Sequence, residues 1–591
     1  MSNIKLFQEQ MKKNRYDAYI IPTSDFHNSE YISEHFKVIK YLTGFTGSAG
    51  TLVVTKTNAY LWVDGRYHLQ ASKEINDDSI ELMKLGEQGT PSVIDFLANF
   101  LEEGNRLAFD GRLLSTQFVL DLKDKINENV QIITNIDLIK FIWEMRPSMP
   151  FSVLYKLDEF FCGKAFDEKL REIRKIMRDE KVNTHIISSL EDQAWLYNLR
   201  GKDVMHTPVF LSYTIITDFE IYLFIDQHKI DISVQKYLDE NGVIIKPYFD
   251  IYDFIKSFRQ RQILIDYNTI NFQIYSNLYL GRNTTINKNN PTSLMKAIKN
   301  EQEIKNIKQA HIKDGLAFTK FMYHLKTNYK NNINMTELSL TEYIDNLRKQ
   351  TKGFVDTSFS TICAFNEHAA MMHYNANEDT NAVINIPGFL LIDSGGHYLE
   401  GSTDITRTIA LGNIDELKKN HFTTVLKSVI ALTTAVFLKG TTGQNLDILA
   451  RGPVWKQLLD YKSGTGHGIG YLLSVHEGPN SFRYNAKNST PLVAGMITTN
   501  EPGIYLENRY GIRIENELLC VEAGASEFGE FLKFETLTYA PIDLDAININ
   551  ILTEDEKYWL NEYHRQVYNI LSPLLTKEEQ EWLAEYTKEI E

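Results

Sequence analysis

The sequence predicts an α/β (α+β) protein in which two related mixed α/β domains precede a third, larger domain. At 591 residues the chain is too long for one hydrophobic core, and about 150 residues per domain suggests three to four domains. One pattern of helices and strands occurs twice in the first half of the chain, and a long amphipathic segment then follows it. We therefore expect domains at residues 1–147, 148–292 and 293–591.

Each copy of the repeat begins with a stretch that predicts a helix end followed by a buried strand. The two stretches are "KNRYDAYIIP" from Lys13 and "DEKVNTHIIS" from Asp179. A further helix and a β-hairpin follow each stretch, and the hairpins span residues 51–64 and 211–226. The segment "MRPSMPFS", residues 145–152, is a natural linker because proline disfavours helix in the residue before it. The second boundary falls near "NKNNPTS", residues 287–293.

The third domain opens with apolar residues at helical spacing from Leu294 onward, which predicts one long amphipathic helix. Two helices are expected at the other end of the chain, with Thr553 and Thr576 as caps before acidic first turns. The apolar stripe of the long helix includes Ile298, Ile304, Ile307, Ala310 and Leu316.

Composition narrows the class of protein. Three scattered cysteines in no metal-binding spacing argue against a disulfide framework and a thiolate zinc site, and a reducing compartment fits best. A net charge of −15 without a basic tract argues against nucleic-acid binding. The start has no apolar signal region, and the chain has no run of about 18 apolar residues, so neither export nor a membrane span is indicated. We expect a cytoplasmic protein.

The stretch "GFLLIDSGGHYLEGSTDITRTIALG" places Asp393 and Asp404 in two strand-like runs joined by a glycine-containing turn. A lone pair of aspartates in turn-rich sequence is usually solvated. If the turn centres on Tyr398 and Leu399, however, the two carboxylates face each other with Cβ atoms about 5 Å apart. Like charges so close require a bound cation or a protonated carboxyl. We therefore expect the hairpin to supply half of a binding site whose other ligands come from the rest of the chain.

Other polar residues of this domain stand where they could complete the site. His467 lies in the glycine-rich stretch "SGTGHGIG", and Glu501 precedes Pro502, which favours an extended backbone at Glu501. In "GIRIENELLC" the period of two places Arg513 and Glu515 on one face. His373 and His476 are flanked by apolar or small residues, and each alone could equally be a core histidine.

Four carboxylates and one imidazole balance the charge of two divalent cations. The set is Asp393, Asp404, His467, Glu501 and Glu515. Oxygen-rich ligands with a single histidine suit Mn²⁺ best among transition ions, while Co²⁺, Fe²⁺ or Zn²⁺ are acceptable substitutes. Two such ions about 3.5 to 4 Å apart can share a bridging hydroxide.

At this point the chain resembles a known family, the pita-bread metallopeptidases, and within it the three-domain aminopeptidase P (Xaa-Pro aminopeptidase) enzymes. The resemblance covers practically the whole chain, and the motifs follow in the order and at about the spacing of that family. The motifs are "GFTGSAG", "WVDGRYHLQA", "DSGGHYLEGSTDITRT", "GTGHGIG", "VHEGP", "EPGIY" and "IRIENELL".

The resemblance implies a role for each site residue. It implies a pita-bread third domain after two creatinase-like domains, the five metal ligands above on a manganese pair, and a homodimer. His373 and His476 would bind substrate around the scissile carbonyl and the proline. Arg513 would support the site beside Glu515, and Arg66 would reach the substrate from outside the catalytic domain. One departure concerns Ser463, where many members have a histidine, and it bears on substrate affinity or the pH profile.

The implied activity is hydrolysis of the N-terminal Xaa-Pro bond of peptides with proline at the second position. The hypothesis is that a metal-bridging hydroxide attacks the carbonyl, His373 stabilises the oxyanion and Glu501 carries the proton to the leaving nitrogen. A prolidase acting only on Xaa-Pro dipeptides is the nearest alternative, although such an enzyme is not expected to carry both preceding domains. A methionine aminopeptidase resembles only the last domain, and a non-catalytic peptide-binding module would not need all five ligands.

Overall fold

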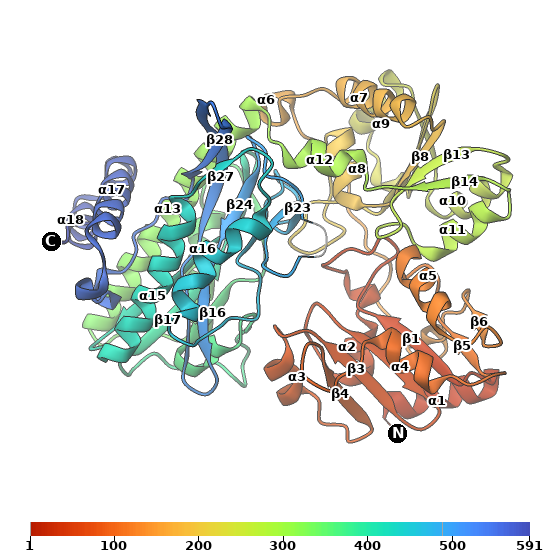
Figure 1. The fold of residues 1–591 in the computed structure, drawn as a ribbon, viewed down its shortest axis with the longest axis horizontal. Helices are drawn as coiled ribbons and strands as arrows, with labels where there is room; N and C mark the ends of the chain where they lie inside the picture. Colours follow the sequence, from red (N-terminus) through yellow and green to blue (C-terminus); the bar gives the residue numbers. More distant parts are fainter. Residues whose placement is uncertain (1, 487–488) are drawn as a thin grey trace. The chain divides into compact units, whose positions relative to one another are not determined.

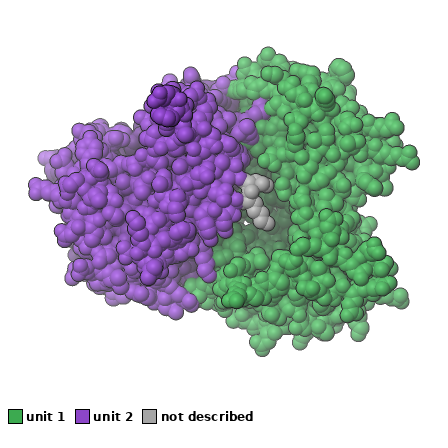
Figure 2. Space-filling view, in the orientation of Figure 1, with its two compact units in different colours: residues 1–158, 164–293 green, residues 159–163, 294–591 purple. Residues whose placement is uncertain are grey.

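The computed structural model describes residues 2–486 and 489–591. The chain forms two compact units, which Figure 2 colours separately. The first unit comprises Met1–Asp158 with Lys164–Ser293, and the second comprises Glu159–Gly163 with Leu294–Glu591. No helix in the described part of the chain is long and apolar enough to cross a membrane.

The first unit contains two six-stranded sheets with the same topology (Figure 1). Their orders are β4-β3-β2-β1-β5-β6 and β12-β11-β10-β8-β13-β14, and equivalent neighbours run parallel or antiparallel alike. The strands of the first sheet are β1 (Ala18–Pro22), β2 (Thr51–Thr55), β3 (Ala59–Val63), β4 (Ile80–Lys84), β5 (Arg106–Ala108) and β6 (Gln131–Ile133). Those of the second are β8 (Thr184–Ile187), β10 (Ser212–Thr217), β11 (Ile221–Ile225), β12 (Val243–Pro247), β13 (Gln262–Ile265) and β14 (Thr284–Asn287). The predicted pair of related folds is confirmed.

Helices cover both faces of the first sheet because its strands are apolar on both sides. One face packs against Phe7 of α1 (Asn3–Asn14) and Leu42 of α2 (Val38–Thr43), and the other against α4 (Val93–Phe100) and α5 (Thr116–Lys125). In the second half, α7 (Phe166–Asp179), α8 (Leu190–Tyr197), α9 (Ile232–Glu240) and α11 (Phe272–Tyr279) accompany the second sheet. The segment 145–152 forms no helix or strand, and the domain boundaries around it stay a prediction.

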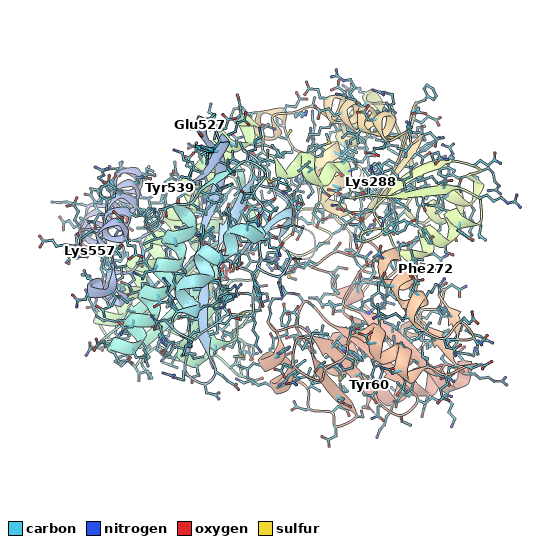
Figure 3. All side chains as sticks on the ribbon, viewed as in Figure 1. Tyr60, Phe272, Lys288, Glu527, Tyr539 and Lys557 are labelled. Atoms are coloured by element: carbon cyan, nitrogen blue, oxygen red, sulfur yellow. The ribbon has the colours of Figure 1, made fainter. Side chains whose placement is uncertain are left out.

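The helix predicted from Leu294 is two helices, so that expectation is corrected. Helix α12 (Pro291–Ala297) ends, and α13 (Glu301–Lys330) begins after Asn300, whose side chain accepts from the backbone N–H of Glu303. This cap satisfies a free helix-end donor, which a continuous helix would not need. Within α13, Gly315 allows close approach of the chain at Tyr539, since a Cβ there would lie 2.1 Å from the Tyr539 carbonyl oxygen. Tyr539 is labelled in Figure 3.

The second unit contains a six-stranded sheet and a three-stranded sheet that carry most of its core. A three-stranded sheet contains β16 (Ile362–Phe365), β17 (Gly388–Ser394) and β20 (Ile405–Leu411), and helix α13 packs on it through Phe318, Phe321 and Met322. The six-stranded sheet has the order β21 (Val436–Leu438), β28 (Gly529–Thr536), β27 (Asn516–Ser526), β24 (Ile497–Asn500), β22 (Gly466–Gly468) and β23 (Glu477–Phe482). Shorter strands are β15 (Phe354–Thr357), β18 (Gly396–Tyr398), β19 (Gly401–Ser402), β25 (Gly503–Leu506) and β26 (Tyr510–Arg513). The further helices are α14 (Glu337–Lys349), α15 (Glu416–Thr433), α16 (Gly443–Trp455), α17 (Glu554–Leu571) and α18 (Lys577–Tyr586).

The two C-terminal helices begin as the sequence predicts. Thr553 caps α17 and Thr576 caps α18, each in a reciprocal capping box with a glutamate three residues later. Their apolar stripes, including Leu560 and Leu583, lie in one hydrophobic core with helix α15 and strand β26. These helices are therefore part of the core of the second unit.

The register of the aspartate hairpin differs from the expectation. Asp393 pairs with Thr406, and Asp404 precedes β20. Asp404 therefore lies two residues from the position directly opposite Asp393. The turn centres on Leu399 and Glu400 because β18 and β19 pair Tyr398 with Gly401. Gly401 has φ 141°, which glycine adopts at no steric cost and other residues avoid. The side-chain period of two keeps both carboxylates directed to the same side.

Candidate metal centre

The structure brings together one ligand atom each from Asp404, His467 and Glu515, all within 4.8 Å of one another. His467 Nε2 lies 3.5 Å from Asp404 Oδ2 and 3.6 Å from Glu501 Oε1. Strand β22 carries His467, while Glu501 follows β24 and Glu515 lies between β26 and β27. Groups far apart in the sequence thus converge where the strands of two sheets end.

Asp393 joins this group through Arg513. The Arg513 Nη2 donates to Asp393 Oδ2 at 2.5 Å, and its Nε lies 4.0 Å from Glu501 Oε2. The Arg513 Nη1 donates to the Tyr505 hydroxyl at 2.7 Å. Arg513 is 3% exposed, so its guanidinium neutralises part of the carboxylate charge in an environment that screens little.

The remaining negative charge and burial raise the pKa values of three carboxyl groups. Burial, followed by repulsion from Glu515, Asp393 and Glu501, raises the pKa of Asp404 well above its usual value. Burial and then the charges of Glu501 and Asp393 raise the pKa of Glu515 in the same way. Burial raises the pKa of Glu501 to about 7, although Arg513 opposes the rise. A bound cation would relieve the repulsion between these buried carboxylates.

The donor set fits divalent metal ions. Among the described residues, Asp393 Oδ1 and Glu515 Oε1 find no hydrogen-bond donor although both atoms are buried. Buried carboxylate oxygens rarely stay without a partner, and oxygen ligands with one imidazole suit ions such as Mn²⁺. The five residues predicted from the sequence are therefore placed together in an arrangement that could hold metal.

A buried network supports the loop that leads to His467. The hydroxyl of Thr465 donates a hydrogen bond to Asp447 Oδ1 at 2.6 Å and accepts one from the Tyr461 hydroxyl at 2.6 Å. Arg451, one turn after Asp447 on α16, donates its Nε to Asp447 Oδ2 at 2.9 Å. The backbone carbonyl of Thr465 accepts the N–H of Glu501 at 2.8 Å. One residue thus connects α16 to two of the five site residues.

A second network holds the segments around Asp404 and Glu515. The backbone N–H of Asp404 donates to Glu517, which also contacts His311 Nε2 at 3.1 Å. The hydroxyl of Thr406 donates to Glu515 Oε2 at 2.8 Å and accepts from Arg513 Nε at 3.1 Å. Sequence reasoning missed these supports. Only Glu517, which shares the strand period of Glu515, and the i, i+4 pair Asp447 and Arg451 left a detectable signal.

The two histidines assigned to substrate occupy different positions. The ring of His476 lies edge-on to that of His467, with centroids 4.3 Å apart at 89°. The next residue, Glu477, is fixed by Lys299 at 2.6 Å and Lys296 at 3.3 Å. His373 is half-buried and lies just after the 3-10 helix η6 (Asn366–Ala370), which packs against β17 and β26. The role of both histidines stays a prediction.

Arg66 belongs to the first compact unit, where its Nε and Nη2 donate to both oxygens of Asp64 at 3.0 and 2.8 Å. Its predicted contact with substrate stays a prediction. Ser463, which stands where a histidine is expected, has a buried hydroxyl oxygen with no hydrogen-bond partner among the described residues. The backbone carbonyl of Ser463 accepts from Arg451 Nη2 at 3.3 Å, so this position belongs to the loop network.

Family models match nearly the whole chain. A creatinase/prolidase N-terminal domain model matches residues 3–147, and a second creatinase/prolidase N-terminal domain model matches residues 145–303. Metallopeptidase family M24 matches residues 305–522, and the C-terminal region of peptidase M24 matches residues 530–590.

Whole proteins and a solved structure agree with these matches. Aminopeptidase P2 of Arabidopsis thaliana is 38% identical over 94% of this chain and 84% of its own length. Xaa-Pro aminopeptidase 1 of Dictyostelium discoideum is 36% identical over 95% of this chain and 92% of its own length. A crystal structure of X-prolyl aminopeptidase from Caenorhabditis elegans, described as a cytosolic enzyme with a di-nuclear active site, is 32% identical and covers 100% of both chains with a TM-score of 0.95. The chain belongs to the Xaa-Pro aminopeptidase family of M24 metallopeptidases.

Proposed function

We propose that the protein is a metal-dependent aminopeptidase that hydrolyses the bond between the first residue and a proline at the second position of peptides. The observation that carries this proposal is the convergence of Asp404, His467 and Glu515, with Asp393 and Glu501 beside them, in one buried and negatively charged site. Membership of the Xaa-Pro aminopeptidase family supplies the reaction class.

The five residues Asp393, Asp404, His467, Glu501 and Glu515 would hold two divalent ions, for which we propose Mn²⁺. When bound, such a pair polarises the scissile carbonyl and supplies activated water at neutral pH. Arg513 holds Asp393 through its Nη2 and keeps this carboxylate in place. The Thr406 hydroxyl does the same for Glu515.

Glu501 is the proposed proton carrier. The Glu501 carboxylate would accept a proton and release it to the leaving nitrogen, which is the role of a general acid–base catalyst. His373 would stabilise the developing oxyanion, and His476, whose ring stands against that of His467, would contact the proline. Arg66 would also bind the peptide. Proline suits a dedicated enzyme because its amide has no N–H and its φ is restricted.

Two alternatives are disfavoured. A prolidase would cleave dipeptides alone and is not expected to carry the pair of similar folds seen in the first unit. A non-catalytic peptide-binding module would have no need for buried, mutually repelling carboxylates, which cost stability without a cation. We further propose that the protein is cytosolic, as the Caenorhabditis elegans relative is described, and that it forms a homodimer.

A substrate panel on the purified full chain tests the proposal. With added Mn²⁺ we expect release of the first residue from an Xaa-Pro-Yaa tripeptide, and no cleavage of the matched Xaa-Ala-Yaa peptide. Metal quantification on the same sample should give two ions per chain. Cleavage of the Xaa-Pro dipeptide only would establish a prolidase, while neither metal nor cleavage would establish a binding module.

A further inference from the structure

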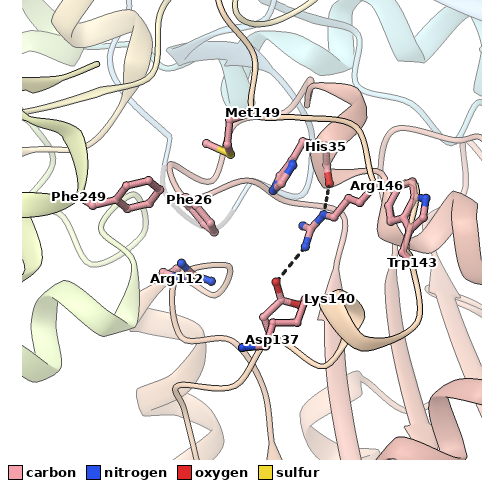
Figure 4. A pocket seen from close by; sticks show the side chains of 9 residues that line it. All are labelled: Phe26, His35, Arg112, Asp137, Lys140, Trp143, Arg146, Met149 and Phe249. Carbon is pink, nitrogen blue, oxygen red and sulfur yellow. Dashed lines mark hydrogen bonds and ion pairs between the residues drawn. The ribbon is translucent and has the colours of Figure 1, made fainter. Parts of the chain in front are cut away.

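The first unit contains a cavity of about 350 Å³ that has no part in the metal centre. We name it the Trp143 pocket and define it by Phe26, Arg112, Lys140, Trp143, Arg146 and Phe249 (Figure 4). Phe249 comes from the 3-10 helix η4 (Tyr248–Asp250), next to strand β12 of the second sheet, and the other five come from the first half of the unit. The pocket therefore lies where the two similar folds of this unit meet.

The cations of the Trp143 pocket are held rigidly. Arg112 donates its Nε and Nη2 to the carboxylate of Asp110 at 2.9 and 2.6 Å, and its guanidinium lies 4.4 Å from the ring centre of Phe26. Arg146 donates to Asp137 at 2.9 Å and to the backbone carbonyl of His35 at 2.8 Å, as the dashed lines in Figure 4 show. Planar guanidiniums fixed in this way lose little freedom when they bind an anion.

Several donors of these cations remain available. In the described part of the chain, no hydrogen-bond acceptor engages Arg112 Nη1, Arg146 Nη2 or Lys140 Nζ. The lining carries three cations, of which Arg112 is paired with Asp110 and Arg146 with Asp137, so the charge of Lys140 is in excess among these residues. This local excess of positive charge occurs in a protein whose net charge is −15, so the pocket departs from the charge of the molecule as a whole.

The other walls of the pocket are aromatic. Trp143 stacks on Tyr41 with centroids 4.5 Å apart, which fixes its ring, and Phe249 is 51% exposed beside Phe26. Aromatic faces favour flat or apolar groups, and arginine and lysine donors favour carboxylates. The volume is at the lower end of small-molecule sites and suits one or two amino-acid residues.

From these features we infer that the Trp143 pocket binds a carboxylate attached to an aromatic or apolar group, with the size of a terminal amino-acid residue. The C-terminal residue of a peptide and a free aromatic carboxylate share this chemistry. The inference goes beyond the proposed peptidase function and does not depend on it, because binding can be measured without catalysis.

Calorimetric titration of the full chain with N-acetyl-tryptophan tests the inference, since this probe has a blocked amino group and no proline. We expect saturable binding, with N-acetyl-tryptophanamide about ten-fold weaker because the amide lacks the charge. Lys140→Glu should weaken binding of the acid about five-fold or more. Lys13→Glu, an equal charge change on exposed α1 of the same unit, should leave it unchanged.

A second pair of variants tests the aromatic wall. Phe249→Ala should weaken the acid about three-fold, whereas Phe219→Ala, at an exposed turn of the same unit, should have no effect. A longer peptide ending in tryptophan that binds like the small acid identifies peptide ends as ligands, and failure of that peptide alone identifies free carboxylates. Absence of saturable binding, equal binding of acid and amide, or equal effects of Lys140→Glu and Lys13→Glu would each overturn the inference.

Discussion

The hydroxyl of Thr465 donates to Asp447 Oδ1 at 2.6 Å in the fully buried interior of the second unit. The backbone carbonyl of the same threonine accepts the N–H of Glu501, and His467 lies two residues further on. A contact between a loop and helix α16 therefore positions two of the proposed metal ligands.

Replacing this hydroxyl should weaken metal binding. Thr465→Val keeps the shape of the side chain but removes a donor from Asp447 and an acceptor from Tyr461. We expect about 10-fold weaker Mn²⁺ affinity and a loss of about 1–3 kcal/mol in the free energy of unfolding. Titration calorimetry and chemical denaturation measure the two effects. Thr465→Ser, which retains the hydroxyl, should behave like the parent protein, and an equal defect in both variants would contradict the role of this hydrogen bond.

Glu501→Gln should separate catalysis from folding. The amide keeps the volume of the side chain and one oxygen, so the fold and much of the metal binding should survive. Turnover of an Xaa-Pro-Yaa peptide should fall about 10²- to 10⁴-fold because the glutamine cannot carry a proton. The control is Glu507→Gln, an exposed glutamate in the following turn. Near-normal turnover of the Glu501 variant would refute the proton-carrier role.

Metal stabilisation should depend on pH. The raised pKa values of Asp404, Glu515 and Glu501 mean that protons compete with cations for these oxygens. Added Mn²⁺ should therefore raise Tm, and the increase should grow as the pH rises from about 6 to about 8. Thermal unfolding with and without a chelator measures this linkage. A rise in Tm that is independent of pH would show that the carboxyl groups are not the ligands.

The C-terminal helix α17 should contribute to stability through one hydroxyl. Tyr563 accepts from Arg407 Nη2 at 2.8 Å and donates to the Ala540 carbonyl at 2.9 Å, while Arg407 Nη1 donates to the Glu515 carbonyl at 2.5 Å. Tyr563→Phe removes one acceptor from Arg407 Nη2, which keeps Asn516 Oδ1 and the Ala540 carbonyl, and one donor from the Ala540 carbonyl, and it should cost about 1 kcal/mol in denaturant unfolding. Tyr558→Phe, on the exposed side of the same helix, is the matched control and should cost nothing measurable.

Acid should destabilise the first unit through buried histidines. Burial lowers the pKa of His185 from 6.5 to about 4 in the folded state, whereas the unfolded chain takes up a proton near pH 6.5. The unfolded state thus binds more protons between these values, so stability is complete above about pH 6.5 and falls by about 3 kcal/mol on acidification to pH 4. Denaturation midpoints across this range should be flatter for His185→Asn than for the control His228→Gln, whose ring is exposed. Equal slopes would exclude His185 as a source of acid sensitivity.

Much of the fold could be predicted from local patterns in the sequence. The repeated helix, strand, helix and hairpin succession predicted two related folds because alternating and helical periodicities are local properties of the chain. The caps Thr553 and Thr576 were readable for the same reason, since a capping box involves residues only three positions apart. The break between α12 and α13 was missed, because apolar spacing continues across Asn300 and only the cap interrupts the helix.

The residues of the candidate site could be predicted from the sequence, but their geometry could not. Charge balance grouped Asp393, Asp404, His467, Glu501 and Glu515, and the resemblance to a known family supported the same set. The register of the hairpin was wrong by two residues, because Gly401 places the turn one position later than symmetry suggests.

The sequence by itself determined much of the secondary structure, the family and the five candidate ligands, because these depend on residue types and spacing along the chain. Only the tertiary structure decided which partners hold them. Thr465 meets Asp447 from 18 positions away, and Arg513 meets Asp393 from 120 positions away. The Trp143 pocket likewise arises where segments of two sheets meet. Such contacts are decided by the packing of whole elements, which no local pattern in the chain encodes.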